Sequence, residues 1–299
     1  MTGRLRIDPA FLAQYPLPPL DRDTDKKQRG RVLVIGGSRE TPGAALLAGV
    51  SALRAGAGNV RIATAQSVAG PLAVAFPEAR VIPCPETAAG GIDPVCADRL
   101  IGLSEAADAI VIGPGMLDEA AVQALAVALL RGVDGPHLLV DAAAFTELRG
   151  HRAVFGPHRG RVVVTPHAGE MARFLRLDRE AVEADPASAG KAIAEIVGGP
   201  VAAKGSTTHV LGLDGEDWVS DHGVLALGTS GSGDTLAGIV AALLARGATP
   251  IVATAWGVYL HAEAGHRLNT RHGPVGLLAR EIPAEIPRIM ADVAAPPAR

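Results

Sequence analysis

Short apolar segments alternate with longer Ala- and Leu-rich segments along most of this 299-residue chain, and this alternation limits its fold more than any other feature. The candidate strands are five short β-branched runs: residues 31–35, 59–63, 109–112, 137–140 and 161–165. Stretches with helical spacing of apolar residues follow, for example residues 43–55 and 119–130. Uninterrupted apolar strands are typical of strands that are buried on both faces. The sequence therefore predicts an α/β protein with three layers, α/β/α, around a central, mostly parallel sheet.

The rhythm changes in the last third of the chain. Residues 201–219 read as short strands joined by turns, with Asp214-Gly215 as the hairpin signal. Two long helices are expected next, at residues 234–245 and 251–268, whereas residues 83–93 look most like a loop. No linker or internal repeat is visible, so we expect a single domain over residues 31–295, preceded by a Pro- and Asp-rich arm at 1–30.

Composition excludes several classes of protein. Hydrophobic residues make up 48% of the chain, which is enough for a full core. A net charge of -3 and only 3% aromatic residues give no field or stacking surface for nucleic acid. Cys84 and Cys96 form no CxxC pattern, the N-terminus lacks the apolar region of a signal peptide, and no apolar run reaches the roughly 20 residues of a membrane span. We expect a reduced, soluble, cytoplasmic protein without a membrane or nucleic-acid partner.

A glycine-rich turn stands immediately before the first of the two late helices, in the segment GTSGSGDTLAG at residues 228–238. Such glycines let successive backbone N–H groups point into one concavity, and the positive end of the helix dipole favours an anion there. Asp234 could simply cap the helix, and taken alone this interpretation is favoured. The combination with Gly231, Gly233 and the small residues that follow favours a general base beside a phosphoryl group.

Other polar segments follow predicted strands. In TPHAGE, residues 165–170, His167 and Glu170 lie on one helix face; an ordinary acidic helix start would explain Glu170 but not His167. Lysine and hydroxyl groups in KGSTT, residues 204–208, suit a phosphate and ribose, although a solvated turn would have the same composition. The turn at residues 113–115 lies where parallel sheets bind ligands. Ser38 could cap a helix or bind phosphate, and both are common in such loops.

Together these segments resemble one enzyme family. GTSGSGD is similar to the GxGD anion-hole motif of the ribokinase-like superfamily, and no P-loop or Rossmann fingerprint is present. The stretch at residues 32–58, the turn GPGM at 113–116, TPHAGE and KGSTT resemble segments of the ADP-dependent NAD(P)H-hydrate dehydratases, and the motifs follow one another in the family's order. The resemblance covers residues 30 to 280.

The resemblance implies a set of roles. Asp234 would be the catalytic base, the amides of Gly231, Ser232 and Gly233 would form the anion hole, and Glu170 would support Mg²⁺ through water. The substrate would contact Ala45, Gly115, His167 and Asp234. The nucleotide ADP, the co-substrate, would contact Lys204, Gly205, Ser206, Thr207, Thr208 and Gly233. The substrates would be the hydrated dinucleotides NADHX and NADPHX, and relatives commonly form homotetramers.

The sequence departs from the family in few places. A stretch that reads DADAL in the family reads DAAAF here at residues 141–145, so Asp141 remains but the second acid is missing and a catalytic role for this loop is unsupported. Many relatives also carry an N-terminal epimerase domain, which thirty residues cannot hold, so dehydratase activity alone is expected. The histidines outside these motifs show no zinc spacing and read as core or surface residues: His209, His222, His261 and His266.

Two alternatives stay open. A small-molecule kinase of the same fold, acting on a hydroxymethylpyrimidine, a thiazole or a sugar, would share Asp234 and the anion hole. A dinucleotide-binding protein without catalysis would need the glycines but not Asp234. His167 replaces an asparagine of the kinases, which favours the dehydratase.

Overall fold

A computed structural model describes residues 4–19 and 29–294, which form one ten-stranded sheet in the order β1-β10-β9-β8-β7-β6-β5-β2-β3-β4. The strands are β1 (Leu5–Arg6), β2 (Arg31–Ile35), β3 (Asn59–Ala65), β4 (Arg80–Cys84), β5 (Ala109–Ile112), β6 (His137–Val140), β7 (Val162–Val164), β8 (Val201–Ala203), β9 (Thr208–Leu211) and β10 (Asp217–Ser220). Only β9 runs antiparallel to its neighbours, so the sheet is mostly parallel, as predicted.

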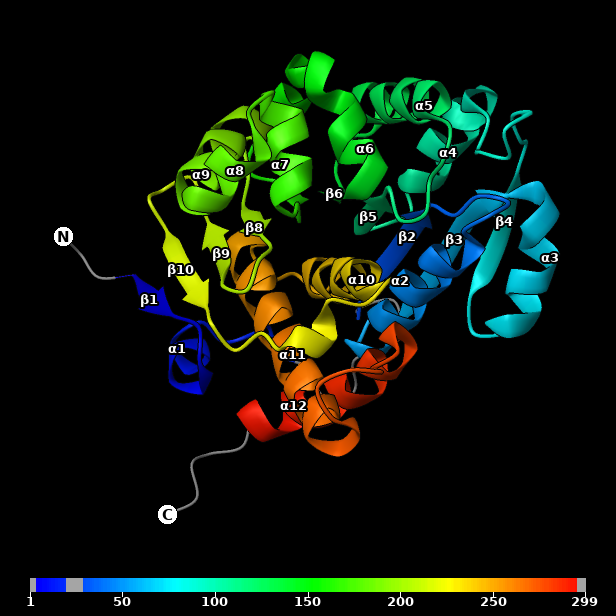
Figure 1. The fold of residues 1–299 in the computed structure, drawn as a ribbon. Helices are drawn as coiled ribbons and strands as arrows, with labels where there is room; N and C mark the ends of the chain where they lie inside the picture. Colours follow the sequence, from blue (N-terminus) through cyan, green and yellow to red (C-terminus); the bar gives the residue numbers. More distant parts are fainter. Residues whose placement is uncertain (1–3, 20–28, 295–299) are drawn as a thin grey trace.

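Helices cover both faces of the sheet (Figure 1). One face carries α1 (Pro9–Gln14), α2 (Pro42–Arg54), α3 (Gln66–Ala75), α10 (Ser232–Ala245), α11 (Pro250–His272) and α12 (Ile282–Ala294). The other carries α4 (Ala97–Ser104), α5 (Glu119–Gly132), α6 (Ala142–Glu147), α7 (Ala168–Leu175), α8 (Arg179–Ala184) and α9 (Pro186–Val197). Short 3-10 turns lie between them: η1 (Pro94–Cys96), η2 (Leu148–Gly150), η3 (Arg152–His158), η4 (Leu225–Leu227) and η5 (Ala279–Glu281). In the described part of the chain, no helix is long and apolar enough to cross a membrane.

The strands are buried on both faces because their side chains alternate between two cores. In β2, Val32 and Val34 pack with α2 and α10, whereas Leu33 and Ile35 pack with the helices of the opposite face. All four side chains are essentially inaccessible to solvent. This alternation explains why the strand sequences are uninterrupted apolar runs rather than apolar and polar residues in turn.

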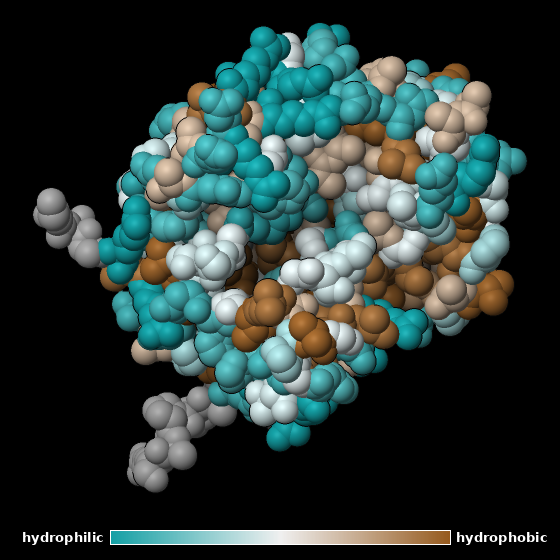
Figure 2. Space-filling model, viewed as in Figure 1, coloured by the Kyte–Doolittle hydropathy of each residue, from teal (hydrophilic) through white to brown (hydrophobic). Residues whose placement is uncertain are grey.

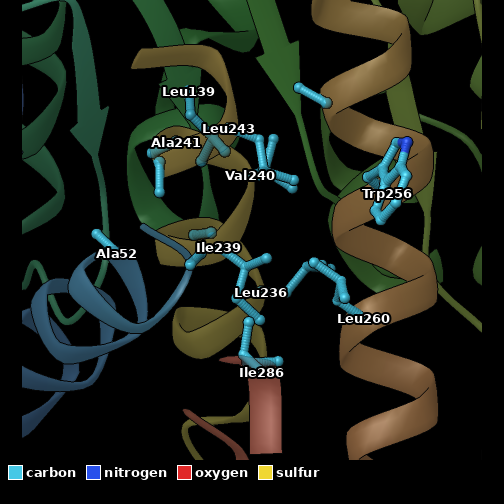
Figure 3. Packing of buried hydrophobic residues seen from close by; sticks show 14 of the residues in the cluster. Ala52, Leu139, Leu236, Ile239, Val240, Ala241, Leu243, Trp256, Leu260 and Ile286 are labelled. Atoms are coloured by element: carbon cyan, nitrogen blue, oxygen red, sulfur yellow. The ribbon is translucent and has the colours of Figure 1, made fainter. Parts of the chain in front are cut away.

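Helix α10 lies at the centre of its layer, and Figure 3 shows its side chains between α2 on one side and α11 on the other. Small residues allow this close packing. A methyl group on Gly238 would overlap the carbonyl oxygen of Ala48 in α2, and one on Gly257 of α11 would overlap Val240. The position of α10, and therefore of its N-terminus, is fixed by close contact on both sides, with the backbone of α2 and with the glycine of α11.

The N-terminal residues contribute to the fold. β1 pairs in parallel with β10, and the rings of Phe11 and Tyr15 lie 4.8 and 5.1 Å from the ring of Trp218. The indole N–H of Trp256 donates to the carbonyl oxygen of Tyr15 at 2.7 Å. The first half of the predicted arm thus belongs to the sheet edge, while residues 20–28 lie outside the described part.

Element boundaries differ from the prediction at several points. The hairpin β9–β10 turns at Asp214-Gly215 as expected. Helix α10 starts two residues earlier than predicted, at Ser232, and α11 continues to His272. The predicted loop at 83–93 overlaps the end of β4, which is an edge strand and can therefore accept Pro83.

Candidate active site

The polar segments predicted from the sequence meet at one edge of the sheet. The carboxyl ends of parallel strands share an edge, and here they supply residues 36–38 after β2, 113–115 after β5, Asp141 after β6, 165–167 after β7 and Lys204 after β8. Figure 2 shows a hollow on this face, with hydrophilic residues above it and hydrophobic residues along its lower margin. The five segments are therefore parts of one site.

The glycine-rich turn forms the N-terminus of α10. Gly231 is the N-cap residue with φ 87°, a left-handed conformation that glycine adopts without strain. Its lack of a side chain also leaves room for Leu47 of α2. The first amide groups of α10 belong to Ser232 and Gly233, and the Ser232 amide donates a hydrogen bond of 3.3 Å to the carbonyl oxygen of Thr229. The Gly233 amide and the helix dipole together can bind an anion at this turn.

Lys204 extends from the end of β8 to this turn. Its Nζ atom lies 3.7 Å from Oδ1 of Asp141, and a methyl group on Gly233 would stand 3.1 Å from the same nitrogen. Asp141 is 2% exposed and also accepts a hydrogen bond of 2.7 Å from the hydroxyl of Thr165. The lysine thus carries positive charge to the place where the sequence predicts a phosphoryl group.

Burial and neighbouring carboxylates change the acidity of the site. Burial, together with the charge of Asp141, raises the pKa of Asp234 to about 7, against the opposing effect of Lys204. Burial also raises the pKa of Glu170, again opposed by Lys204. Although burial disfavours an ammonium group, Asp141, Glu170 and Asp234 together raise the pKa of Lys204. Asp234 can therefore exchange a proton near neutral pH, while Lys204 stays charged.

His167 has a structural role that the sequence argument did not foresee. Its Nδ1 atom accepts hydrogen bonds from the amides of Gly169 and Glu170 at 3.0 and 3.3 Å, and Glu170 Oε2 accepts one from the His167 amide at 2.8 Å. This capping box fixes the start of α7. The expectation that a helix start leaves His167 unexplained was wrong, because the imidazole itself is the cap. The side chain is still 59% exposed, and its contact with substrate stays a prediction.

Three cavities open around His167. The largest, about 670 Å³, is lined by Lys204, Gly205, Ser206, Thr208, Ser232 and Gly233, and on its apolar side by Val224, Leu225, Leu227, Leu236 and Val258. A second of about 580 Å³ shares Lys204 to Ser206 and adds Thr207, and a third of about 400 Å³ includes Glu170 and Met116. All the predicted nucleotide residues therefore surround two adjoining cavities, one of which has an apolar wall suited to a base.

Gly115 and Ala45, both expected to contact substrate, lie beside the first strand–helix loop. The hydroxyl of Thr41 donates to the carbonyl oxygen of Gly115 at 2.7 Å and lies 2.7 Å from the hydroxyl of Ser38, so the two loops are tied together. Ala45 is completely buried in α2 and packs near Gly37. Its contact with substrate stays a prediction.

His261 is a site residue that the sequence analysis assigned to core or surface. Its Nε2 atom lies 3.0 Å from the carbonyl oxygen of Ser232 and 2.9 Å from the Ser232 hydroxyl. Burial lowers its pKa to about 4, so it is neutral and Nε2–H can donate to Ser232. No local sequence signal marks this contact, because it joins two helices and depends on how α10 and α11 pack.

The donor groups fit a metal ion that is carried by a nucleotide. Among the described residues, no group of three His, Cys, Asp or Glu side chains is arranged to hold a metal ion. Glu170 is 15% exposed and borders a cavity next to the anion hole. Because Mg²⁺ keeps several waters and often uses phosphate oxygens with only one or two carboxylates, Glu170 could support it through water.

Sequence comparison places the chain among known enzymes. Residues 32–288 match the family described as NAD(P)H-hydrate dehydratase. The ADP-dependent (S)-NAD(P)H-hydrate dehydratase of Xanthomonas campestris pv. campestris is 47% identical over 97% of this chain and 98% of its own length. The bifunctional NAD(P)H-hydrate repair enzyme of Moorella thermoacetica is 34% identical over 96% of this chain, which spans 54% of that enzyme.

Solved structures share the architecture. A ribokinase-like superfamily protein from Enterococcus faecalis superposes with a TM-score of 0.84 at 28% identity, over 99% of this chain and 98% of its own. The ADP/ATP-dependent NAD(P)H-hydrate dehydratase from Bacillus subtilis, co-crystallized with ATP/Mg²⁺, gives 0.80 at 27% identity over 98% and 100%. The predicted ribokinase-like fold is confirmed, and the chain belongs to the NAD(P)H-hydrate dehydratase family.

Proposed function

We propose that this chain repairs hydrated NADH and NADPH by ADP-dependent dehydration, releasing AMP and phosphate. The observation that carries the proposal is Asp234, a base with a pKa of about 7 at the N-terminus of α10, beside the anion-binding turn and Lys204. A base of this strength is well matched to deprotonating a hydroxyl at neutral pH.

The first step transfers a phosphoryl group. The substrate carries a hydroxyl on its reduced nicotinamide ring; Asp234 takes the proton as the oxygen attacks the terminal phosphorus of ADP, and the bond to the bridging oxygen breaks to leave AMP. The amides of Gly231, Ser232 and Gly233 would stabilise the charge that develops on the phosphoryl oxygens. Mg²⁺, supported by Glu170 through water, would neutralise phosphate charge when bound.

The second step needs little from the protein. Phosphorylation converts hydroxide, a poor leaving group, into phosphate. The lone pair of the ring nitrogen then expels the phosphate, and the adjacent ring carbon loses a proton, which the phosphate can accept, to restore the dihydropyridine. This chemistry belongs to the substrate, so the step needs no second acid–base pair from the protein.

The cavities accommodate two ligands at once. The largest cavity combines an apolar wall with Lys204, Gly205 and the first residues of α10, so it suits the adenosine and phosphates of ADP. The cavity at Glu170 and Met116, which also borders His167 and has a volume of about 400 Å³, would receive part of the dinucleotide. A kinase of the same fold would share the first cavity. A hydroxyethylthiazole kinase from Pyrococcus horikoshii has the same fold, with a TM-score of 0.57 at 18% identity.

The variant Asp234→Asn tests the assignment. We expect turnover of hydrated NADH with ADP to fall about 1000-fold, because the amide cannot accept the proton, while calorimetry shows ADP binding retained. Normal turnover in the variant would remove Asp234 from the mechanism. Loss of ADP binding together with turnover would mean that the substitution had damaged the site instead.

A further inference from the structure

We propose that Asp141 is a positioning residue that holds the ammonium group of Lys204 at the floor of the anion hole and away from the catalytic base. The inference rests on the proposed function and gives a role to Asp141, the one acidic residue in the DAAAF stretch at residues 141–145. It makes Asp141, Thr165 and Lys204 one unit, built from the ends of three neighbouring strands.

The carboxylate of Asp141 contacts two side chains, those of Thr165 and Lys204. It is 2% exposed, and its Oδ1 atom accepts from the Thr165 hydroxyl at 2.7 Å and lies 3.7 Å from Lys204 Nζ. Asp141 stands at the N-cap position of α6, but its side chain caps no amide of that helix. Helix capping, the usual role of an aspartate at a helix start, therefore does not explain Asp141. The ion pair with Lys204 gives this buried carboxylate a role.

Lys204 needs such a partner because its ammonium lies among three carboxylates. Asp141, Glu170 and Asp234 all act on its charge, and Gly233 lets it reach the first turn of α10. Without Asp141, the ammonium would be drawn to Asp234 or Glu170. An ion pair with Asp234 would occupy the base that must accept the substrate's proton. Asp141 thus keeps the lysine near the phosphoryl group and the base free.

Thr165 completes the arrangement. Thr165 follows β7 and is completely buried, so the hydrogen bond from its hydroxyl to Asp141 Oδ1 is shielded from water. A carboxylate held from one side by this hydroxyl can turn little, and it therefore fixes the place of the lysine. The bond orients Asp141 but adds no charge, so its loss should matter less than the loss of the carboxylate.

The test compares Asp141→Asn, Lys204→Ala and the double variant, with turnover and the rescue of Lys204→Ala by added ethylammonium as readouts. We expect Asp141→Asn to lower kcat about 100-fold, as a misplaced catalytic group does. The double variant should be no worse than Lys204→Ala within about threefold, because Asp141 acts through the lysine. Ethylammonium should restore activity to Lys204→Ala but not to the double variant, which lacks the carboxylate that holds the amine. Thr165→Val should lose less than Asp141→Asn.

The control is Asp108→Asn, which breaks a shorter and more exposed ion pair, 2.7 Å from Arg31, at the opposite edge of the sheet. It should leave kcat unchanged and show no coupling to Lys204→Ala, and circular dichroism checks that all the variants fold. Additive losses from Asp141→Asn and Lys204→Ala, or equal rescue with and without Asp141, would overturn the proposal. Calorimetric ADP affinities of the same proteins measure the coupling between Asp141 and Lys204 even if the wild type does not turn over hydrated NADH. The role of Asp141 and the repair function can therefore be tested separately.

Discussion

Two pairs of helices on opposite faces of the sheet are packed in different ways. Helices α2 and α10 meet through small residues, and Gly238 has no room for a side chain against Ala48. Helices α6 and α7 meet through large ones: the ring of Phe145 stacks on that of Phe174 at 4.3 Å, and Phe155 lies 6.5 Å away. The first pair carries the anion hole and Asp234, and the second follows Asp141 and carries Glu170.

This difference in packing gives the two helix pairs different mobility. Backbone contact between helices leaves no freedom for side-chain rearrangement, so the amides at the start of α10 hold a fixed geometry. Contact through large side chains tolerates small shifts of the helices, which suits the side of the site that borders the cavity at Met116 and Glu170. On this account, the transferring phosphoryl group meets the rigid face of the site.

The largest effect is expected from Gly238→Ala. The added methyl group would overlap the Ala48 carbonyl oxygen, so α2 and α10 must separate, and the free energy of unfolding should fall by about 3 kcal/mol. Gly102→Ala on exposed α4, where nothing lies within 4 Å, should instead stabilise the protein by about 0.5–1 kcal/mol. Urea denaturation measures the free energy of unfolding of both variants. Equal changes in this free energy would contradict the close backbone contact at Gly238.

On the opposite face, Phe174→Leu should lower the free energy of unfolding by about 1–2 kcal/mol because it leaves a void beside Phe145 and Phe155. Turnover should change less than threefold, since the anion hole belongs to the other layer. Thermal unfolding and steady-state kinetics together measure this. A loss of kcat as large as that in Asp141→Asn would show that the two faces are not separate in function.

His261→Ala removes the hydrogen bonds to Ser232 that hold the start of α10. We expect kcat to fall about tenfold, the equivalent of one hydrogen bond near 1.4 kcal/mol. Since the pKa of His261 is lowered to about 4, the imidazole is neutral from pH 5 to pH 9, and the loss should be constant over that range. A loss that grows with acid would mean that the charged imidazole acts.

The smallest effect concerns stability and Asp234. Its pKa of about 7 exceeds the ordinary value of 3.8, so between these pH values the native protein keeps a proton that the unfolded chain has lost. The stability contributed by this group is therefore full at low pH and is lost as pH rises to about 7. Asp234→Asn should be more stable than the wild type at pH 8, by about 1 kcal/mol once solvent screening reduces the roughly 4 kcal/mol of the full pKa difference, and equal near pH 4. Thermal melts at both pH values measure this difference, and its absence at pH 8 would contradict the raised pKa.

Much of the fold could be predicted because its signals are local. Uninterrupted apolar strands, the Asp214-Gly215 turn and the glycines before α10 each act within a few residues, and the structure places them as expected. β4 was missed because it is a short edge strand with Pro83 in it. β1 was missed because two residues carry no periodicity and gain their pairing from β10, more than 200 residues away.

Site residues could be predicted from the sequence only where neighbouring residues form a recognisable motif. The segments at Lys204 and Glu170 meet because parallel strands bring their carboxyl ends to one edge, and Asp234 joins them from the first turn of α10. The role of His261 and the pairing of Asp141 with Lys204 depend on contacts between distant segments, so no pattern in the sequence contains them.

The most direct test of the account mixes the purified protein with acid-generated hydrated NADH, Mg²⁺ and either ADP or ATP, and follows absorbance at the NADH wavelength, with Asp234→Asn as the control. We expect NADH to return only when ADP is present and not to return in the variant. No return with either nucleotide would contradict the repair function, and a return that persists in Asp234→Asn would contradict the role of the base.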